Sequence, residues 1–430
     1  MNSIQKLLVE IGFPFDFEYY QKMNPELMNM PRPIVAHHAS LYAEANGKTV
    51  SEFHIPQKLI DFVNEKITNY NLRALEIGPF DNPALVGGVK YFDVLNSEKL
   101  RERAVKENRP FNKVPNKIDF VDPNGDLSII PDKYFDIVFS SHCIEHQVDF
   151  ISHLQKVSTI LNKEGVYVMK IPDKRYMFDH FLAETNLAEI INAYHDKRKF
   201  HTYQSVLEHR MLVTHNDGVR HWLGLHGDDR FSKECFEAAE QEFKVNNEKY
   251  IDVHSWHFTP NSFYNLIQKL NKLGFTDLVP YSIFHTLWGN IEFTAILKKE
   301  ESVRTSYKIV ICDEINGFID EIFPITIGIE YLYLRGWNIC TSDIGKEAER
   351  VIVFRYNDGS CSCFPLKQIE RQDIVNLYND ESHRMAGFCC FIERKKILEN
   401  KSVDILVGYK VRTNVFCKKL AGECIYKKSS

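Results

Sequence analysis

Two neighbouring segments, each pairing an apolar strand with an acid, constrain this chain more than any other feature. We expect one strand over residues 72–77, which contains Glu76 and runs into Gly78 and Pro79, and a second over residues 89–94, which contains Asp93. Open α/β sheets bind ligands at the carboxyl ends of their strands. A carboxylate at that edge accepts hydrogen bonds from both hydroxyls of a ribose. The two segments therefore predict a nucleoside-containing cofactor.

The turn after the first strand argues against a cofactor that carries phosphates. It contains no G-x-G-x-x-G sequence, the pattern that holds a pyrophosphate. Pro79 also lacks the backbone N–H that a phosphate would bind. Glu76 would repel a pyrophosphate and attract an amino group or a sulfonium cation. The turn thus favours a nucleoside without phosphates.

The chain after Asp93 alternates between strand and helix patterns. Strands are expected over residues 117–120, 134–140 and 166–171, and a helix over residues 148–161 because its apolar residues recur at helical spacing. A turn over residues 124–127 places Asp126 where it can meet an adenine amino group. Such alternation predicts an α/β fold with a parallel sheet and right-handed crossovers.

Residues 56–300 resemble the class I S-adenosylmethionine-dependent methyltransferases. The resemblance rests on the Leu-Glu-Ile-Gly motif at residues 75–78 and on Phe-Asp-Ile-Val at 135–138, followed by Glu-His at 145–146. A helix over residues 259–273 and a hairpin over 275–298 match the end of that fold. The resemblance implies a Rossmann-like, doubly wound, seven-stranded sheet and S-adenosyl-L-methionine as cofactor. It places Glu76 and Gly78 at the methionine end, Asp93 at the ribose, and Asp126 with Leu127 at the adenine; Pro79 and Ser141 complete the predicted cofactor site. Pro79 departs from the second glycine of many relatives, which affects the amino-acid pocket.

The rest of the chain divides into a small helical module at residues 1–55 and a β-sandwich-like accessory domain at residues 301–430. The helical module resembles segments attached to bacterial surface-polysaccharide enzymes, on Phe-Asp-Phe-Glu-Tyr-Tyr at 15–20 and Asn-Pro-Glu-Leu at 24–27. A helical cap on the sheet domain is the alternative. The C-terminal region resembles accessory domains of glycan-assembly enzymes, on Gly336-Trp337 and Gly387-Phe388. Both resemblances imply contacts with glycan-assembly proteins, a polymer or a second copy of the chain.

Composition excludes several classes of function. The formal net charge of −5 provides no basic field for a nucleic acid. No apolar run approaches the roughly 20 residues needed to span a bilayer. Ten cysteines without C-x-x-C spacing favour reduced thiols, and hence a cytoplasmic protein.

The 17 histidines supply candidates for a general base. His142 and His146 follow the fourth expected strand, where the methyl group would be presented. An insertion over about residues 175–258 adds His221 and His226 in a His-Trp-x-Gly-x-His-Gly pattern, which resembles polysaccharide-linked relatives. The insertion is dense in aromatic and polar groups that suit a carbohydrate. The predicted substrate-binding residues are Asp217, Trp222, Asp228, His254, Trp256 and His257. We therefore expect O-methylation of a sugar, a nucleotide sugar or a glycan.

Three alternatives remain open on the sequence. His142-Cys-Ile-Glu-His146 matches the H-x-x-E-H pattern of zinc peptidases, but the motif directly follows a strand instead of lying on a helix. The chain could be a non-catalytic scaffold, or a methyltransferase whose acceptor is a non-sugar molecule. The mixed donors Asp217, His221, His226 and Asp228 select no particular metal, and no metal is predicted.

Overall fold

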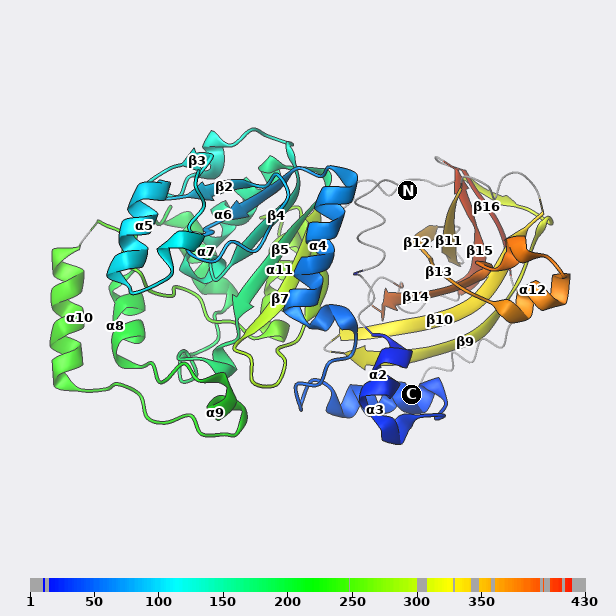
Figure 1. Ribbon diagram of the computed structural model, residues 1–430, viewed down its shortest axis with the longest axis horizontal. Coiled ribbons are helices and arrows are strands. Elements are labelled where there is room, and N and C mark those ends of the chain that lie inside the picture. The colour runs from blue at the N-terminus through cyan, green and yellow to red at the C-terminus, as the bar shows by residue number, and fades with distance from the viewer. Residues whose placement is uncertain are drawn as a thin grey trace. The chain divides into compact units, whose positions relative to one another are not determined.

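The computed structural model describes residues 11, 15–246, 248–299, 308–327, 329–341, 348–356, 360–394, 397, 403–411 and 414–419. The chain divides into two compact units (Figure 1). One spans Glu44–Glu300 and contains the α/β sheet. The other combines Met1–Ala43 with Glu301–Ser430 and contains two β-sheets. We call them the α/β unit and the β unit.

A seven-stranded sheet organises the α/β unit, as expected. Its strands are β1 (Ala74–Ile77), β2 (Lys90–Asp93), β3 (Phe120–Val121), β4 (Phe135–Ser141), β5 (Leu161–Pro172), β6 (Leu278–Phe284) and β7 (Glu292–Lys299), in the order β3-β2-β1-β4-β5-β7-β6. Strands β1 to β5 pair in parallel, and β7 runs antiparallel between β5 and β6. The strand order reverses between β1 and β4, where such sheets bind ligands. This arrangement confirms the predicted Rossmann-like fold.

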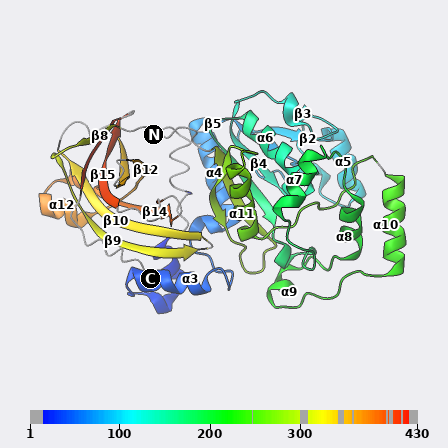
Figure 2. The ribbon, with the colours of Figure 1, turned by 180° about the vertical axis from the view of Figure 1, so that it is seen from behind.

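Helices cover both faces of this sheet. They are α4 (Pro56–Tyr70), α5 (Ser97–Lys106), α6 (Phe150–Ile160), α7 (Leu187–His195) and α11 (Pro260–Lys272). Helices α6, α7 and α11 share one hydrophobic core with one face of the sheet and lie in front in Figure 2. Phe150 is fully buried in that core between Trp256, Phe258 and Phe263. Caps fix where these helices begin, because Asp149 accepts the N–H of Ser152, and Thr259 forms a capping box ahead of Pro260.

The insertion between β5 and α11 consists of short helices joined by loops. Besides α7 it contains α8 (Tyr203–Met211), α9 (Gly218–Trp222) and α10 (Lys233–Val245). The side chains of Thr202, Asp217 and Ser232 cap the amino ends of α8, α9 and α10. Helices α8 and α10 lie side by side (Figures 1 and 2). They share a small core with the segment that leads back to the sheet, and that core contains Val206, Ala239 and Val253.

The C-terminal part of the β unit is a pair of sheets, mostly antiparallel. Its strands are β8 (Lys308–Ile311), β9 (Ile315–Ile327), β10 (Ile329–Cys340), β11 (Glu349–Tyr356), β12 (Cys361–Pro365), β13 (Lys367–Ile369), β14 (Gly387–Glu393), β15 (Val403–Val411) and β16 (Asn414–Lys419). The sheet orders are β13-β14-β10-β9 and β12-β11-β15-β16-β8, with β16 and β8 parallel. Leu334 and Phe388 of the first sheet share a core with Ile352 and Val407 of the second. The expected all-β region is thus confirmed.

Two elements of this region differ from expectation. The sequence predicts no strand over residues 315–326, yet β9 occupies them. Pro324 and the charged Asp320 and Glu321 are unusual in strands, so the local sequence gave no strand signal. Because β9 is an edge strand, it tolerates a proline that a central strand would not. A short helix, α12 (Gln372–Tyr378), was also not expected. The sequences Ile-Gly at 344–345 and Asn-Asp-Gly at 357–359 also predict turns between strands, and these residues lie outside the described part of the chain.

The N-terminal helices α2 (Phe17–Met23) and α3 (Arg32–Tyr42) pack within the β unit. The Phe17 ring lies 4.9 Å from the Tyr333 ring and 5.9 Å from the Phe323 ring, centroid to centroid. Arg32 forms an ion pair of 3.3 Å with Glu321. The helices thus cover β9 and β10. Across the described residues, no helix is both long enough and apolar enough to cross a membrane.

Candidate active site

The turn after β1 leaves room for a ligand beside the backbone. Gly78 has a φ of +68°, a conformation that glycine adopts without strain, and its N–H donates to the Phe92 carbonyl over 2.9 Å. A Cβ added at Gly78 would meet no atom within 4 Å. The hydrogen bond therefore ties the ends of β1 and β2 together while one side of the turn stays open.

The Glu76 side chain hydrogen-bonds to the loop that follows this turn. Its carboxylate accepts the N–H of Ala84 over 2.9 Å and the N–H of Leu85 over 3.0 Å. Asn64 of α4 binds the same loop through the Ala84 carbonyl and the Val86 N–H. Burial raises the pKa of Glu76 to about 7, although both N–H groups act to lower it. Glu76 thus shapes the loop, and its predicted contact with the methionine end of a cofactor stays a prediction.

Asp93 ends β2 with a largely buried carboxylate. Its Oδ1 accepts the N–H of Leu95 over 3.0 Å, and burial raises the pKa of the carboxyl to about 6. Pro79 is buried, and the Arg103 guanidinium lies 4.8 Å from the centre of the Phe80 ring. Arg103 also acts electrostatically on Asp93. A buried acceptor next to an open glycine turn suits the ribose of a nucleoside.

The residues predicted to face adenine occupy the loop after β3. Asp126 is half exposed and caps a short 3-10 helix (Leu127–Ile129), with one oxygen on the Ser128 N–H at 2.9 Å and the other on the Ser128 hydroxyl at 2.6 Å. These bonds hold the pKa of Asp126 below its usual value. Leu127 is buried in the main core. Ser141 is the last residue of β4 and pairs with Lys170 of β5.

His142 follows β4 in a strained left-handed conformation, with a φ of +47°. Its Nε2 lies 2.7 Å from Oε2 of Glu292 on β7, and the other Glu292 oxygen binds Lys170 at 2.7 Å. Burial lowers the pKa of His142, but the bond to Glu292 and the charge of Glu145 outweigh that effect and raise it. Burial raises the pKa of Glu292, but His142 and Lys170 bring it to about 2. The side chain of His142 is 34% exposed, so this paired imidazole is accessible.

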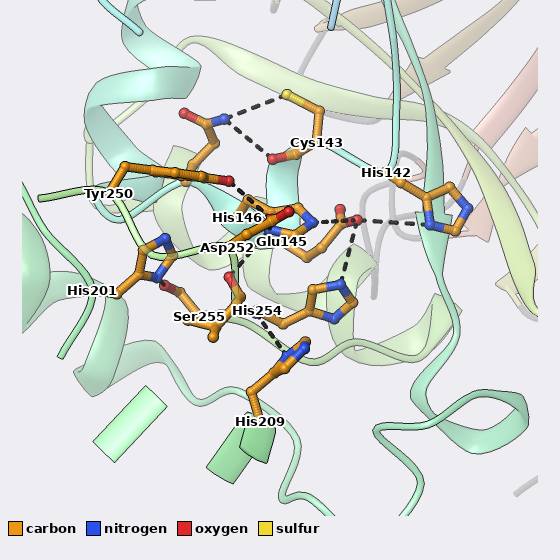
Figure 3. Close-up of polar contacts among 12 residues, drawn as sticks. His142, Cys143, Glu145, His146, His201, His209, Tyr250, Asp252, His254 and Ser255 are labelled. Carbon is orange, nitrogen blue, oxygen red and sulfur yellow. Dashed lines mark hydrogen bonds and ion pairs between the residues drawn. The ribbon is translucent and has the colours of Figure 1, made fainter. Parts of the chain in front are cut away.

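Glu145 lies at the centre of a cluster of histidines (Figure 3). It is 1% exposed, and neither of its oxygens has a hydrogen-bond partner. Its Oε1 lies 3.8 Å from Nδ1 of His142, 3.8 Å from Nε2 of His146 and 4.0 Å from Nε2 of His254. His254 in turn contacts Asp179 at 2.6 Å. We refer to Glu145, His146 and His254 as the Glu145 centre.

Burial dominates the electrostatics of this centre. It raises the pKa of Glu145 to about 7 and lowers the pKa of His146 and of His254 to about 3. Both imidazoles are therefore neutral at physiological pH. Burial also raises the pKa of the Cys143 thiol to about 12, which excludes Cys143 as a thiolate nucleophile.

Tyr250 and Asp252 connect the Glu145 centre to the cofactor edge. Asp252 accepts the Tyr250 hydroxyl at 3.1 Å, lies 3.3 Å from Nδ1 of His146, and pairs with Arg103 at 3.0 Å. Tyr250 is 58% exposed. Arg103 is the residue that also faces Phe80 and Asp93. Arg103 and Asp252 thus link the region around Asp93 to His146 of the Glu145 centre.

The other two histidines predicted to be catalytic lie in a different cluster. Nδ1 of His221 is 3.0 Å from Nδ1 of His226, and the His226 ring stacks on His180 at 3.6 Å. His180 donates from Nδ1 to the Arg175 carbonyl, and His221 donates from Nε2 to the His215 carbonyl. We call His180, His221 and His226 the His180 stack.

The predicted substrate residues also lie in different parts of the α/β unit. Trp222 stacks on Tyr176, with ring centroids 3.8 Å apart, and Asp217 caps α9 through the Arg220 N–H. Asp228 is exposed. Trp256 is buried in the main core, and His257 is buried with its Nε2 4.0 Å from Asp179. Of the six, only His254 belongs to the Glu145 centre.

One family model matches part of the α/β unit, from residue 84 to residue 169. The family is described as "Methyltransferase domain". S-adenosyl-L-methionine is the cofactor that this match indicates, and the open Gly78 turn beside the buried Asp93 carboxylate fits its nucleoside. No curated protein matches the chain.

Several solved structures resemble the chain distantly. A protein from Methanococcus maripaludis described as an S-adenosyl-L-methionine-dependent methyltransferase is 13% identical, with a TM-score of 0.27, over 63% of this chain and 94% of that one. The trans-methyltransferase CalH, solved with SAH, is 10% identical with a TM-score of 0.28, over 64% and 60%. The mitomycin 7-O-methyltransferase MmcR is 11% identical with a TM-score of 0.26, over 69% and 67%. Likenesses at this level leave the acceptor open.

Sequence reasoning missed several polar residues of the α/β unit. Glu145 was visible in the H-x-x-E-H motif but was not predicted as a site residue. That motif lies on a 3-10 turn (Ile144–His146), so its histidines do not share a helical face. Asp252 and Tyr250 stand within four residues of His254, which could have drawn attention to them. Asp179 and Glu292 gave no local signal, because their partners are distant in the sequence.

Proposed function

We propose that this protein transfers a methyl group from S-adenosylmethionine to a hydroxyl of a sugar, in nucleotide-sugar or cell-surface polysaccharide biosynthesis. The observation that carries the proposal is His142, an accessible histidine oriented by Glu292 directly after β4. A carboxylate that holds one nitrogen of an imidazole leaves the other free to act as a base. Hydroxyl acceptors need such a base more than thiols or amines do.

In the proposed step, His142 is the base, and Glu292 and Lys170 hold it in position. When bound, S-adenosylmethionine supplies a methyl group on a sulfonium. Glu292 accepts the Nε2 hydrogen of His142, so the lone pair lies on Nδ1. That lone pair takes the hydroxyl proton as the acceptor oxygen forms its bond to the methyl carbon, while the carbon–sulfur bond breaks and its electrons return to sulfur. Lys170 neutralises Glu292 and keeps it in place.

The surroundings of the Glu145 centre support a sugar as acceptor. Tyr250 offers an exposed aromatic face, and Asp252 beside it offers a carboxylate for sugar hydroxyls. Binding sites of small molecules combine such faces with a few polar groups. The His-Trp-x-Gly-x-His-Gly pattern adds the resemblance to polysaccharide-linked relatives, and Trp222 within it stacks on Tyr176. We assign contacts with glycan-assembly proteins to the β unit, on the resemblance of its Gly336-Trp337 and Gly387-Phe388 strands.

Transfer of radiolabelled methyl from S-adenosylmethionine to a panel of acceptors tests this proposal. The panel contains nucleotide sugars, glycan fragments, small phenols and amines, and binding of S-adenosylhomocysteine is measured in parallel by calorimetry. We expect label on a sugar hydroxyl. Label only on phenols or amines would overturn the sugar assignment. An absence of cofactor binding would favour a non-catalytic scaffold instead.

A further inference from the structure

The Glu145 carboxylate presents a physical problem that the methyl-transfer chemistry leaves unexplained. It is 1% exposed and neither oxygen accepts a hydrogen bond, whereas the great majority of buried polar groups are paired. Leaving a buried carboxylate without partners costs several kcal/mol in general. A fold that retains such a group needs a further ligand to compensate for it.

The nearest groups to Glu145 are arranged to present lone pairs to it. His146 donates from Nδ1 to the Val253 carbonyl, which can only accept, so its lone pair lies on Nε2. His254 donates from Nδ1 to Asp179, and its lone pair is likewise on Nε2. These two Nε2 atoms are the ones that face Oε1 of Glu145, at 3.8 and 4.0 Å. Two imidazole nitrogens and one carboxylate oxygen, each able to offer a lone pair, thus face one another.

We infer that Glu145, His146 and His254 bind a divalent transition metal ion. Their donor atoms all lie within 4.8 Å of one another. Ligand atoms around a tetrahedral Zn²⁺ with bonds of about 2.0–2.1 Å lie about 3.3 Å apart, so an inward shift of a few tenths of an ångström closes the site. Asp179 and the Val253 carbonyl orient the two imidazoles, which is the outer-shell arrangement of metal-binding histidines.

The donor set indicates the class of metal and its use. Two imidazoles and one carboxylate form three-ligand sites that leave positions open, and they suit Zn²⁺ or Fe²⁺ better than Mg²⁺ or Ca²⁺. An open position lets the metal bind the acceptor oxygen and lower the pKa of its hydroxyl. His142, whose Nδ1 is 3.8 Å from Oε1 of Glu145, lies next to that position. This use of the metal rests on the proposed function, whereas metal binding itself does not.

Titration of the chelator-treated full-length protein with Co²⁺ tests the site, because bound Co²⁺ absorbs in the visible and Zn²⁺ displaces it. We expect saturable binding in the wild type. Glu145→Gln and His254→Ala should weaken binding by more than about 100-fold, and Asp179→Asn by about 10–100-fold, the usual cost of an outer-shell partner. His195→Ala removes an exposed histidine of the same insertion and serves as the matched control.

Each other outcome contradicts the assignment in a different way. Binding that survives Glu145→Gln but is lost in His221→Ala would move the metal to the His180 stack. Binding lost in His209→Ala but kept in His146→Ala would move it to the alternative group of Asp179, His209 and His254. No binding by the wild type would overturn the proposal altogether. Calorimetry with S-adenosylhomocysteine on every variant shows that the domain is folded, and it separates failure of this site from failure of the cofactor site.

Discussion

The two histidine clusters of the α/β unit differ in how their polar atoms are satisfied. In the His180 stack, His221 and His226 contact each other at 3.0 Å, and backbone carbonyls take the remaining hydrogens of His180 and His221. In the Glu145 centre, the imidazoles are bonded only on their far sides, and the carboxylate between them has no partner. Asp179 and His180 are adjacent in the chain, yet Asp179 contacts His254 of the Glu145 centre whereas His180 belongs to the other cluster.

This difference separates a structural arrangement from a reactive one. Hydrogen bonds within the His180 stack pair most of its ring nitrogens with one another or with the backbone, which stabilises the local fold. A buried carboxylate without partners lowers stability and persists where function requires it. We therefore place the chemistry at the Glu145 centre with His142, and we assign the His180 stack to the substrate region.

The largest expected effect comes from His142→Ala. Loss of the general base should lower kcat by about 10²- to 10⁴-fold. Affinity for S-adenosylhomocysteine should stay the same, because Asp93 and Gly78 are untouched. Steady-state methyl transfer and calorimetry measure the two quantities, with His195→Ala as the control. An unchanged kcat would remove the distinction between the clusters and require another base.

A smaller effect, on cofactor affinity, is expected from Asp93→Ala. This variant tests whether Asp93 binds the cofactor while the Glu145 centre and His142 act on the acceptor. Loss of one charge-assisted hydrogen bond costs on the order of 1.5–3 kcal/mol, which weakens cofactor binding by about 10- to 150-fold. Binding requires the ionised carboxylate, whose pKa burial raises to about 6. Affinity of the wild type should therefore be full above that pH and decline as the pH falls through it.

The alanine variant provides the internal control for this pH dependence. Its affinity for S-adenosylhomocysteine should be low and nearly independent of pH, while Asp132→Ala, which removes an exposed acid of the same domain, should follow the wild type. Calorimetric titrations across the range measure both. Equal affinities of Asp93→Ala and wild type would place the nucleoside elsewhere.

The smallest effect is expected from His221→Ala. Removing one hydrogen bond of the His180 stack should cost about 0.5–1.5 kcal/mol. We expect that cost in KM for the sugar acceptor, with kcat nearly unchanged, because no atom of His221 lies in the Glu145 centre. Kinetics at saturating cofactor separate the two constants. A fall in kcat comparable to that of His142→Ala would show that both clusters take part in the chemistry.

Local patterns were enough to predict most of the sheet of the α/β unit. Strands β1, β2 and β4 and helices α6 and α11 all fall within the expected ranges or within two residues of them, because each carries its own apolar spacing, cap or glycine. Prediction failed where a neighbour outweighed the local signal. Strand β9 contains Pro324 and two acids, and pairing with β10 makes it a strand. For the insertion the sequence indicated only a density of aromatic and polar residues, although caps at Thr202, Asp217 and Ser232 begin three helices there.

By itself the sequence determined most strands of the α/β sheet, the turn at Gly78 and the acid at Asp93, since these depend on residues close together in the chain. Only the tertiary structure decided which histidines act together. Glu145, Asp179, His254 and Glu292 come from four separate segments, and no spacing in the sequence brings them to one place. Burial and the pairing of polar atoms are properties of packing. For that reason the unpaired Glu145 carboxylate becomes visible only once the chain has folded.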